Sequence, residues 1–240
     1  MPLARSRLLR TCRYALKFDG VDDYVSIADS ASLKPDCITI MAWVKKPTTS
    51  RGAIIGKTLD SDPYGTQTFA LMWGGSYWGG YLWDSAGTMH LVAGGTLEVN
   101  EWINLALTYD GSVQRLYKNA VEIASSSWSG VLRKTVSPVR LGRWWRSDPA
   151  WWDGFIAQIL IYSRSLSQDE IQWNINNPDN PVWNGLVLWL PGLDEYIQPP
   201  TWYDRSIFKN NGTIYGATKT EIILKAVRSQ APLRIQSPVR

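Results

Sequence analysis

The feature of this 240-residue sequence that most restricts its fold is a succession of short β-type segments separated by turn signals. Apolar residues alternate with others along residues 38–45 and again along residues 102–110. Strands with one apolar face and one mixed face are typical of two stacked sheets, so the sequence predicts an all-β fold. The expected strands are 15–19, 24–28, 38–45, 69–73, 81–84, 102–110, 114–118, 139–141, 155–162, 186–190 and 213–215.

One short helix is expected over residues 168–174. Ser167 stands three residues before Glu170, which is the spacing of a capping box. Two Asn-Pro pairs, at 177–178 and 180–181, then end the helical pattern.

Charge is distributed unevenly along the chain, whose formal net charge is +4. Residues 1–13 and 219–240 are basic, whereas the segment between them is net acidic. We therefore expect basic tails at 1–13 and 219–240 on a single sandwich over 14–218. The acidic body disfavours nucleic acid, which the tails could bind. No apolar run is long enough to span a membrane, and residues 1–13 do not match a secretion signal.

Several motifs, in order, resemble those of the laminin G-like (concanavalin A-like) jelly-roll family. Residues 16–25, LKFDGVDDYV, resemble the FDGxDDYV opening of that family, and residues 40–45, IMAWVK, resemble its AWVK strand. Residues 102–111, WINLALTYDG, resemble WxHVALTYDG, and residues 152–167 resemble FDGxIDEVRIYNRALS. The resemblance covers about residues 14–176 and implies a two-sheet antiparallel jelly-roll sandwich.

One segment departs from the family's order. Residues 185–195, GLVLWLPGLDE, and the turn-rich stretch after them resemble the family's first segment, which precedes FDGxDDYV there but comes last here. We expect a circular permutation in which residues 185–218 supply the opening strands. The alternatives are strand exchange with a neighbouring subunit, which would make a homo-oligomer, and the truncated start of a second repeat. Residues 186–190 are apolar on both faces, so they require a buried place.

Catalysis is not expected. Glycan hydrolases with this fold need two carboxylates projecting from one strand, and the sequence holds no such cluster. Asp169 and Glu170 are adjacent at the start of the expected helix, and Asp22 and Asp23 belong to a turn. The single histidine, His90, makes a Ser-His-Asp triad a poor fit.

The resemblance also implies a structural Ca²⁺ near the edge of the sandwich, held by hard oxygen ligands. The positions that could match are Asp19, Asp153, Glu195 and Asp204. Two of the family's carboxylates are missing, because its IDE reads Ile156-Ala157-Gln158 here. The aspartates could instead accept hydrogen bonds from turn backbone.

Aromatic loops carry the expected ligand contacts, because sugars lay their C–H faces on Trp or Tyr rings and need polar groups for their hydroxyls. The segments 73–84 and 143–152 supply both ingredients. The residues expected to bind are Tyr77, Trp78, Arg143, Trp145, Arg146, Asp148 and Trp151. Trp43, Trp102, Trp152 and Trp189 are expected in the core. A protein–protein patch has the same composition as such loops.

Two functions stay open on the sequence alone. One is a non-catalytic, lectin-like module that recognises a surface glycan. The other is a structural or assembly protein, such as a virion or cell-surface component, that holds neighbouring subunits through the sandwich and its basic tails. The fold-level association with glycans favours the first, and the basic ends with the displaced segment favour the second. Both imply an extracellular, virion-surface or cell-surface location.

Two local features complete the expectations. Cys12 and Cys37 either form a disulfide or remain free thiols. Asn119-Ala120 stands where the family has Asn-Gly, so a type I′ turn would place Ala120 at positive φ at a cost of about 1 kcal/mol. The hairpin must use another turn or tolerate this strain.

Overall fold

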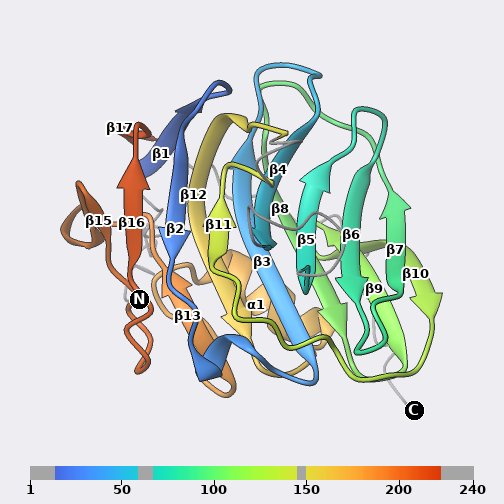
Figure 1. Cartoon of the computed structure of the whole chain (residues 1–240). Helices are drawn as coiled ribbons and strands as arrows, with labels where there is room; N and C mark the ends of the chain where they lie inside the picture. Colours follow the sequence, from blue (N-terminus) through green and yellow to red (C-terminus); the bar gives the residue numbers. More distant parts are fainter. Residues whose placement is uncertain (1–13, 59–66, 145–149, 223–240) are drawn as a thin grey trace, which may run out of the picture.

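The computed structural model describes residues 14–58, 67–144 and 150–222, which form two stacked antiparallel sheets (Figure 1). In spatial order, sheet A consists of β10 (Val121–Ser127), β9 (Val113–Lys118), β8 (Trp102–Tyr109), β3 (Ile38–Lys45), β12 (Asp153–Tyr162), β1 (Tyr14–Asp19) and β17 (Thr218–Glu221), with β13 (Leu186–Leu190) also paired to β12. Sheet B consists of β14 (Ile197–Gln198), β15 (Thr201–Trp202), β16 (Gly212–Tyr215), β2 (Tyr24–Ile27), β11 (Val139–Leu141), β4 (Gly52–Lys57), β5 (Phe69–Trp73), β6 (Trp78–Trp83) and β7 (Met89–Gly94). The helices of the described part are α1 (Gln168–Asn176) and the 3₁₀ helices η1 (Ala31–Leu33) and η2 (Asp194–Tyr196). The predicted two-sheet antiparallel sandwich is confirmed.

The alternation of apolar residues places two hydrophobic layers in the molecule. The main core lies between the sheets, where residues such as Leu105 of sheet A and Leu71 of sheet B are fully buried. A second cluster covers the outer face of sheet A, where Trp43 and Trp189 pack with Ile171 of α1. Figure 1 accordingly shows α1 behind the sheets, on the side away from sheet B. The outer face of sheet B is the one that no helix of the described chain covers.

Residues 185–218 supply strands to their own chain. β13 pairs with the second half of β12, from Ile159 to Tyr162, whereas β1 pairs with the first half, from Asp153 to Ile156. The Tyr14 backbone N–H donates to the Gly192 carbonyl (3.0 Å) where the two strands meet. β13 and β1 are therefore successive halves of one composite strand. Within this single chain, the arrangement agrees with the permutation hypothesis.

β13 occupies the buried place that its sequence requires. Leu188 and Leu190 belong to the core between the sheets, and Leu186 and Trp189 belong to the cluster under α1. Burying such side chains contributes about 1.5–3 kcal/mol each relative to leaving them in water. The displaced segment is thus an integral part of the sandwich.

The sandwich extends past the predicted start of the C-terminal tail. Residues 219–221 belong to β17, which pairs with β1. Lys219 forms an ion pair with Asp194 (2.5 Å) and lies over the Tyr14 ring (4.8 Å). The boundary predicted after residue 218 is therefore corrected to at least residue 221. The predicted tails at 1–13 and from 223 onward lie outside the described residues.

The sequence pattern misplaced β6 and missed β4, β7, β10 and β17 as well as the two-residue strands β14 and β15. Gly79 and Gly80 precede the strand expected at 81–84 but lie inside β6. A Cβ on Gly80 would come within 2.4 Å of Leu107 Cδ1 from the opposite sheet, and a Cβ on Gly79 within 2.7 Å of the Tyr81 ring. These glycines therefore make room for packing on both faces of a strand and do not form a turn.

The β9–β10 hairpin shows which turn forms at Asn119 and Ala120. Asn119 (φ 52°) and Ala120 (φ 64°) are both left-handed, as a type I′ turn requires. Ala120 is nevertheless buried, and its carbonyl accepts a hydrogen bond from Gln168 Nε2 of α1 (2.8 Å). Packing against the helix offsets the strain, so the strained alternative is the one adopted.

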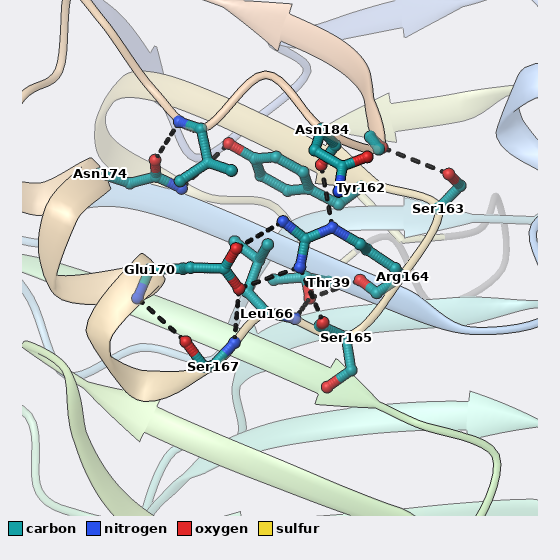
Figure 2. Close-up of polar contacts among 12 residues, drawn as sticks. Thr39, Tyr162, Ser163, Arg164, Ser165, Leu166, Ser167, Glu170, Asn174 and Asn184 are labelled. Atoms are coloured by element: carbon teal, nitrogen blue, oxygen red, sulfur yellow. Dashed lines mark hydrogen bonds and ion pairs between the residues drawn. The ribbon is translucent and has the colours of Figure 1, made fainter.

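A polar network fixes α1 and the connection from α1 to β13 (Figure 2). Arg164 forms a bidentate pair with Glu170 (2.9 and 2.6 Å), and Ser167 completes the predicted capping box. Arg164 Nε also donates to the Asn184 carbonyl (3.0 Å). Asn174 donates to the Tyr162 hydroxyl (3.0 Å) and accepts the Val182 N–H (2.8 Å). The connection is therefore held at Val182 and at Asn184.

Two further observations concern the predicted properties of the chain. Cys37 is a free thiol whose pKa is raised by burial and by the nearby Asp110 carboxylate, while Cys12 lies outside the described residues. In the part of the chain that the structure describes, none of the helices has the length and apolar character of a membrane span.

Candidate functional site

An aromatic cluster of four residues, Tyr24, Arg143, Trp151 and Tyr215, lies at one end of sheet B. Tyr24 of β2 and Tyr215 of β16 are register partners, and their rings stack at 4.5 Å with an interplanar angle of 11°. The Arg143 guanidinium lies 5.0 Å from the Tyr24 ring and 5.2 Å from the Trp151 ring. These are cation–π distances, so one guanidinium bridges two aromatic faces.

The displaced segment and one turn bring the aromatic cluster together. Tyr215 reaches Tyr24 because β16, from residues 185–218, lies beside β2. Gly142 (φ 84°) turns the chain sharply after β11, and a Cβ there would come within 2.5 Å of the Phe18 ring. The Trp152 N–H then donates back to the Gly142 carbonyl (2.8 Å). Arg143 and Trp151 therefore stand at the two ends of a closed loop.

The aromatic cluster is accessible to solvent. Tyr215 is 45% exposed, and Tyr24, Arg143 and Trp151 are half-buried. Aromatic faces can support the C–H face of a sugar ring, and a guanidinium offers several hydrogen-bond donors in one plane. This combination can bind a ligand that has both a flat apolar face and oxygen acceptors.

A second aromatic row crosses the outer face of sheet B. The Trp144 ring lies against β4 at Gly56, where a Cβ would come within 2.5 Å of it, and it stacks on Trp83 at 5.8 Å. Trp83 in turn stacks on Tyr81 at 6.3 Å. Trp144 and Trp83 are buried, whereas Tyr81 and its hydrogen-bonded neighbour Tyr77 are half-buried. Burial and the contact with Tyr77 raise the pKa of Tyr81, so its hydroxyl stays neutral.

The structure shows where four of the predicted ligand contacts lie and corrects the expected exposure of one of them. Trp78 was expected in an exposed loop but is fully buried, because β6 begins at this residue and directs it into the core. Its Nε1 donates to the Thr96 carbonyl (3.0 Å). Arg143 and Trp151 lie together, and Tyr77 lies in the other aromatic row. Trp145, Arg146 and Asp148 lie outside the described residues.

The prediction for the core tryptophans is mostly confirmed. Trp43, Trp152 and Trp189 are buried, whereas Trp102 is half-buried against Phe155.

Sequence reasoning missed Tyr24 and Tyr215, and it left Tyr81, Trp83 and Trp144 of its aromatic segments out of the residues expected to bind. A signal existed for Tyr81 and Trp83, since period-2 alternation places them on the face opposite to Leu82. For Tyr24 and Tyr215 the contact depends on pairing between segments about 190 residues apart in the chain, which local pattern does not encode.

The four predicted calcium ligands do not form one site. Asp204 is only 2% exposed and accepts hydrogen bonds from the backbone N–H groups of Trp189, Ser206 and Asn210 and from the Ser206 hydroxyl. The Asp153 oxygens are engaged by the Lys46 ammonium (2.6 Å) and the Thr48 hydroxyl (2.8 Å). Glu195 is exposed on η2. The predicted set is therefore corrected: Asp204 organises a loop, and a lysine neutralises Asp153.

Among the described residues, carboxylates gather instead in the turn between β1 and β2. Ligand atoms of Asp19, Asp22 and Asp23, which we call the acidic turn, lie within 4.8 Å of one another. Asp19 Oδ1 accepts the N–H groups of Val21 and Asp22, and Asp23 Oδ2 accepts the N–H of Asp19 (2.9 Å). Burial and the neighbouring carboxylates raise the pKa of Asp23. The oxygens that do not bond to the backbone fit a hard cation, and the turn directly precedes Tyr24.

Comparison with known proteins begins with a family model. Residues 19–172 match the model of the concanavalin A-like lectin/glucanases superfamily. No curated protein matches the sequence significantly.

Solved structures share the fold at low identity. One is a candidate carbohydrate binding protein of Bacteroides ovatus, with 18% identity and a TM-score of 0.70 over 88% of this chain. This chain spans 60% of that protein's length. The CBM40 of Ruminococcus gnavus IT-sialidase, bound to α2,3 sialyllactose, has 16% identity and a TM-score of 0.54 over 68% of this chain and 98% of its own. Mouse laminin α1 domains LG4-5 have 11% identity and a TM-score of 0.51 over 70% of this chain and 48% of their own.

Proposed function

This chain belongs to the concanavalin A-like lectin/glucanases superfamily, and we propose that it is a non-catalytic module that binds a surface glycan through its aromatic cluster. The observation that carries the proposal is the Arg143 guanidinium held over Tyr24 and Trp151, beside the exposed ring of Tyr215. The rings supply surfaces for sugar C–H groups, and the guanidinium supplies donors for hydroxyl or carboxylate oxygens. Two relatives by fold are described as a candidate carbohydrate binding protein and as a module bound to a sialylated sugar.

The acidic turn supports binding and not turnover. A glycosidase needs one carboxylic acid and one carboxylate on either side of the bond that it cleaves. Here Asp19 and Asp23 accept backbone N–H groups of their own turn, which holds them in place. Their remaining oxygens can accept sugar hydroxyls at the edge of the aromatic cluster.

We propose that the expected Ca²⁺ binds at the acidic turn, which keeps Asp19 from the predicted ligands and replaces Asp153, Glu195 and Asp204 with Asp22 and Asp23. Binding of a divalent cation to the folded state alone raises the melting temperature as its concentration rises. Millimolar CaCl₂ should therefore stabilise the wild type but not Asp22→Asn, in which one exposed carboxylate is lost. Equal responses of the two proteins would contradict this placement.

The assembly hypothesis draws less support from the described residues. Its basic tails lie outside them, and residues 185–218 pair within their own chain. An exposed aromatic and arginine cluster also suits a protein partner, so the experiment must separate the two. A glycan ligand would place the protein at an extracellular or surface location.

The test is a glycan array followed by titration of the best ligand. Trp151→Ala and Tyr215→Ala should each weaken binding at least tenfold, which corresponds to about 1.4 kcal/mol. Phe208→Ala is the matched control, because Phe208 is an exposed aromatic outside the aromatic cluster. Absence of glycan binding, or equal affinity of Trp151→Ala and wild type, would contradict the proposal and leave a protein partner as the better explanation.

A further inference from the structure

A third group of aromatic residues, apart from both groups on sheet B, lies on the α1 side of the molecule. Trp173 is 49% exposed on α1, and Trp183 is 52% exposed in the connection from α1 to β13. Asn176, Asn180 and Asn184 are exposed around them. We call these five residues the Trp–Asn patch. It is separate from the aromatic cluster, because α1 covers sheet A whereas the cluster lies on sheet B (Figure 1).

One asparagine holds both exposed indoles. Trp173 Nε1 donates to the Asn180 carbonyl (3.0 Å), and Trp183 Nε1 donates to Asn180 Oδ1 (3.2 Å). The polar edges of both rings are therefore occupied by the protein, which leaves their apolar faces for a ligand. The Asn180 amide nitrogen donates no hydrogen bond to another described residue, so it remains available as a donor.

The scaffold beneath the Trp–Asn patch is fixed before any ligand arrives. Asn174 binds the Val182 N–H, and Arg164 binds the Asn184 carbonyl, so the connection is held on both sides of Trp183 (Figure 2). Trp183 also makes an edge contact with the buried Trp189 at 5.4 Å. A surface whose side chains are already positioned loses little conformational entropy on binding.

The chemistry of the patch selects a neutral ligand. All five of its side chains are uncharged. Of the charged residues beside it, Arg164 is paired with Glu170 in bidentate geometry, Arg205 lies over the Trp189 and Tyr196 rings, and Asp179 has a partner of its own. Asn176 ends α1, where the helix dipole presents partial negative charge that disfavours anions. Side-chain amides both donate and accept, as hydroxyl groups require.

We propose that the Trp–Asn patch is a second binding site, which takes a neutral oligosaccharide by stacking pyranose C–H faces on Trp173 and Trp183 and bonding hydroxyls to Asn180. The site is independent of the aromatic cluster, where Arg143 also suits an anionic sugar. A chain with both sites can engage one branched glycan, or two strands of a polysaccharide, at once. Two linked contacts raise the apparent affinity without any new interaction.

Affinity electrophoresis in gels that contain mannan, xylan, laminarin or hydroxyethylcellulose tests the proposal, with heparin as the anionic comparison. We expect at least one neutral polysaccharide to retard the wild type. Trp173→Ala and Trp183→Ala should each weaken that retardation at least tenfold, and Asn180→Ala should weaken it less. Phe208→Ala is the control for loss of an exposed aromatic residue, and Trp151→Ala reports on the aromatic cluster alone.

The indole N–H region of a ¹⁵N–¹H spectrum identifies the site directly, since the chain has 14 tryptophans and Trp→Phe variants assign them. An oligosaccharide of the retarding polymer should shift the Trp173 and Trp183 signals. Retardation that is lost in Trp151→Ala but unchanged in Trp173→Ala and Trp183→Ala would overturn this inference and leave the proposed function intact. The reverse pattern would overturn the proposed function and support this inference. The inference is also overturned if no neutral polymer retards the protein. It is likewise overturned if the wild type is a dimer that Trp183→Ala converts to a monomer, because a second copy would then cover the patch.

Discussion

The ion pair between Arg164 and Glu170 should make the stability of the protein depend on pH in a defined window. Hydrogen bonds from the Arg164 guanidinium, helped by the Ser167 backbone N–H, lower the pKa of Glu170 to about 2, from 4.5 in an unperturbed glutamate. A difference of that size corresponds to about 3 kcal/mol of folding free energy. The two side chains are 28% and 32% exposed, so solvent screening reduces the expected contribution to about 1–2 kcal/mol.

The sign of the effect follows from the lowered pKa. Because the folded state holds the carboxylate in its charged form, the contribution is complete above about pH 4.5 and disappears as the pH falls through about 2. Glu170→Gln keeps the size of the side chain but removes its charge. We therefore expect the variant to be about 1–2 kcal/mol less stable than wild type at pH 7, with a difference that shrinks to nearly zero at pH 2.

Urea unfolding at a series of pH values, followed by tryptophan fluorescence, measures this difference. Glu195→Gln is the control, because Glu195 is an exposed glutamate outside the network of Figure 2, and it should leave stability unchanged. The reasoning is refuted if Glu170→Gln matches wild type at pH 7, or if its deficit stays constant between pH 7 and pH 2. A constant deficit would mean that the variant disturbs packing and not an ionised pair.

Three other perturbations test the packing and the chain order. Gly56→Ala would push a methyl group into the Trp144 ring and should lower the free energy of unfolding by about 1–3 kcal/mol, as measured by urea unfolding. An unchanged unfolding midpoint would show that the ring moves freely. Asp204→Ala should lower the free energy of unfolding by about 3 kcal/mol, because the buried backbone N–H groups that bond to this carboxylate lose their acceptor. Thermal unfolding measures the change, and a loss below about 1 kcal/mol would argue against that role. A rearranged gene that encodes residues 185–221, an Asn-Gly turn and then residues 14–184 should yield the same fold, because Glu221 and Tyr14 are register partners. A circular dichroism spectrum without the wild-type β signal would contradict the pairing of β17 with β1.

Much of the fold could be predicted because the strands of sheet A carry their positions in local pattern. In β3, Ile40 and Val44 point to the core while Met41 and Trp43 point to the helix side, as alternation requires. The capping box at Ser167 likewise fixed the start of α1 from local sequence. The prediction failed at β6, where glycine reads as a turn residue but serves close packing.

The candidate site was harder to predict because it depends on long-range pairing. Arg143 and Trp151 were named from composition, and the structure places both in the aromatic cluster. Tyr215 was not named, since its role depends on β16 lying beside β2. The metal prediction followed family positions, and Asp153 shows the physical reason for the correction: the Lys46 ammonium already holds its carboxylate.

The composite strand has a consequence for anything attached to this protein. The two halves of the composite strand are not joined by a peptide bond. A hydrogen bond from the Tyr14 N–H to the Gly192 carbonyl links them where they meet. Tyr14, the first residue of β1, and Glu221, the last residue of β17, face each other as register partners. A partner joined directly to Tyr14 and another joined directly to Glu221 would therefore start from the same corner of the sandwich.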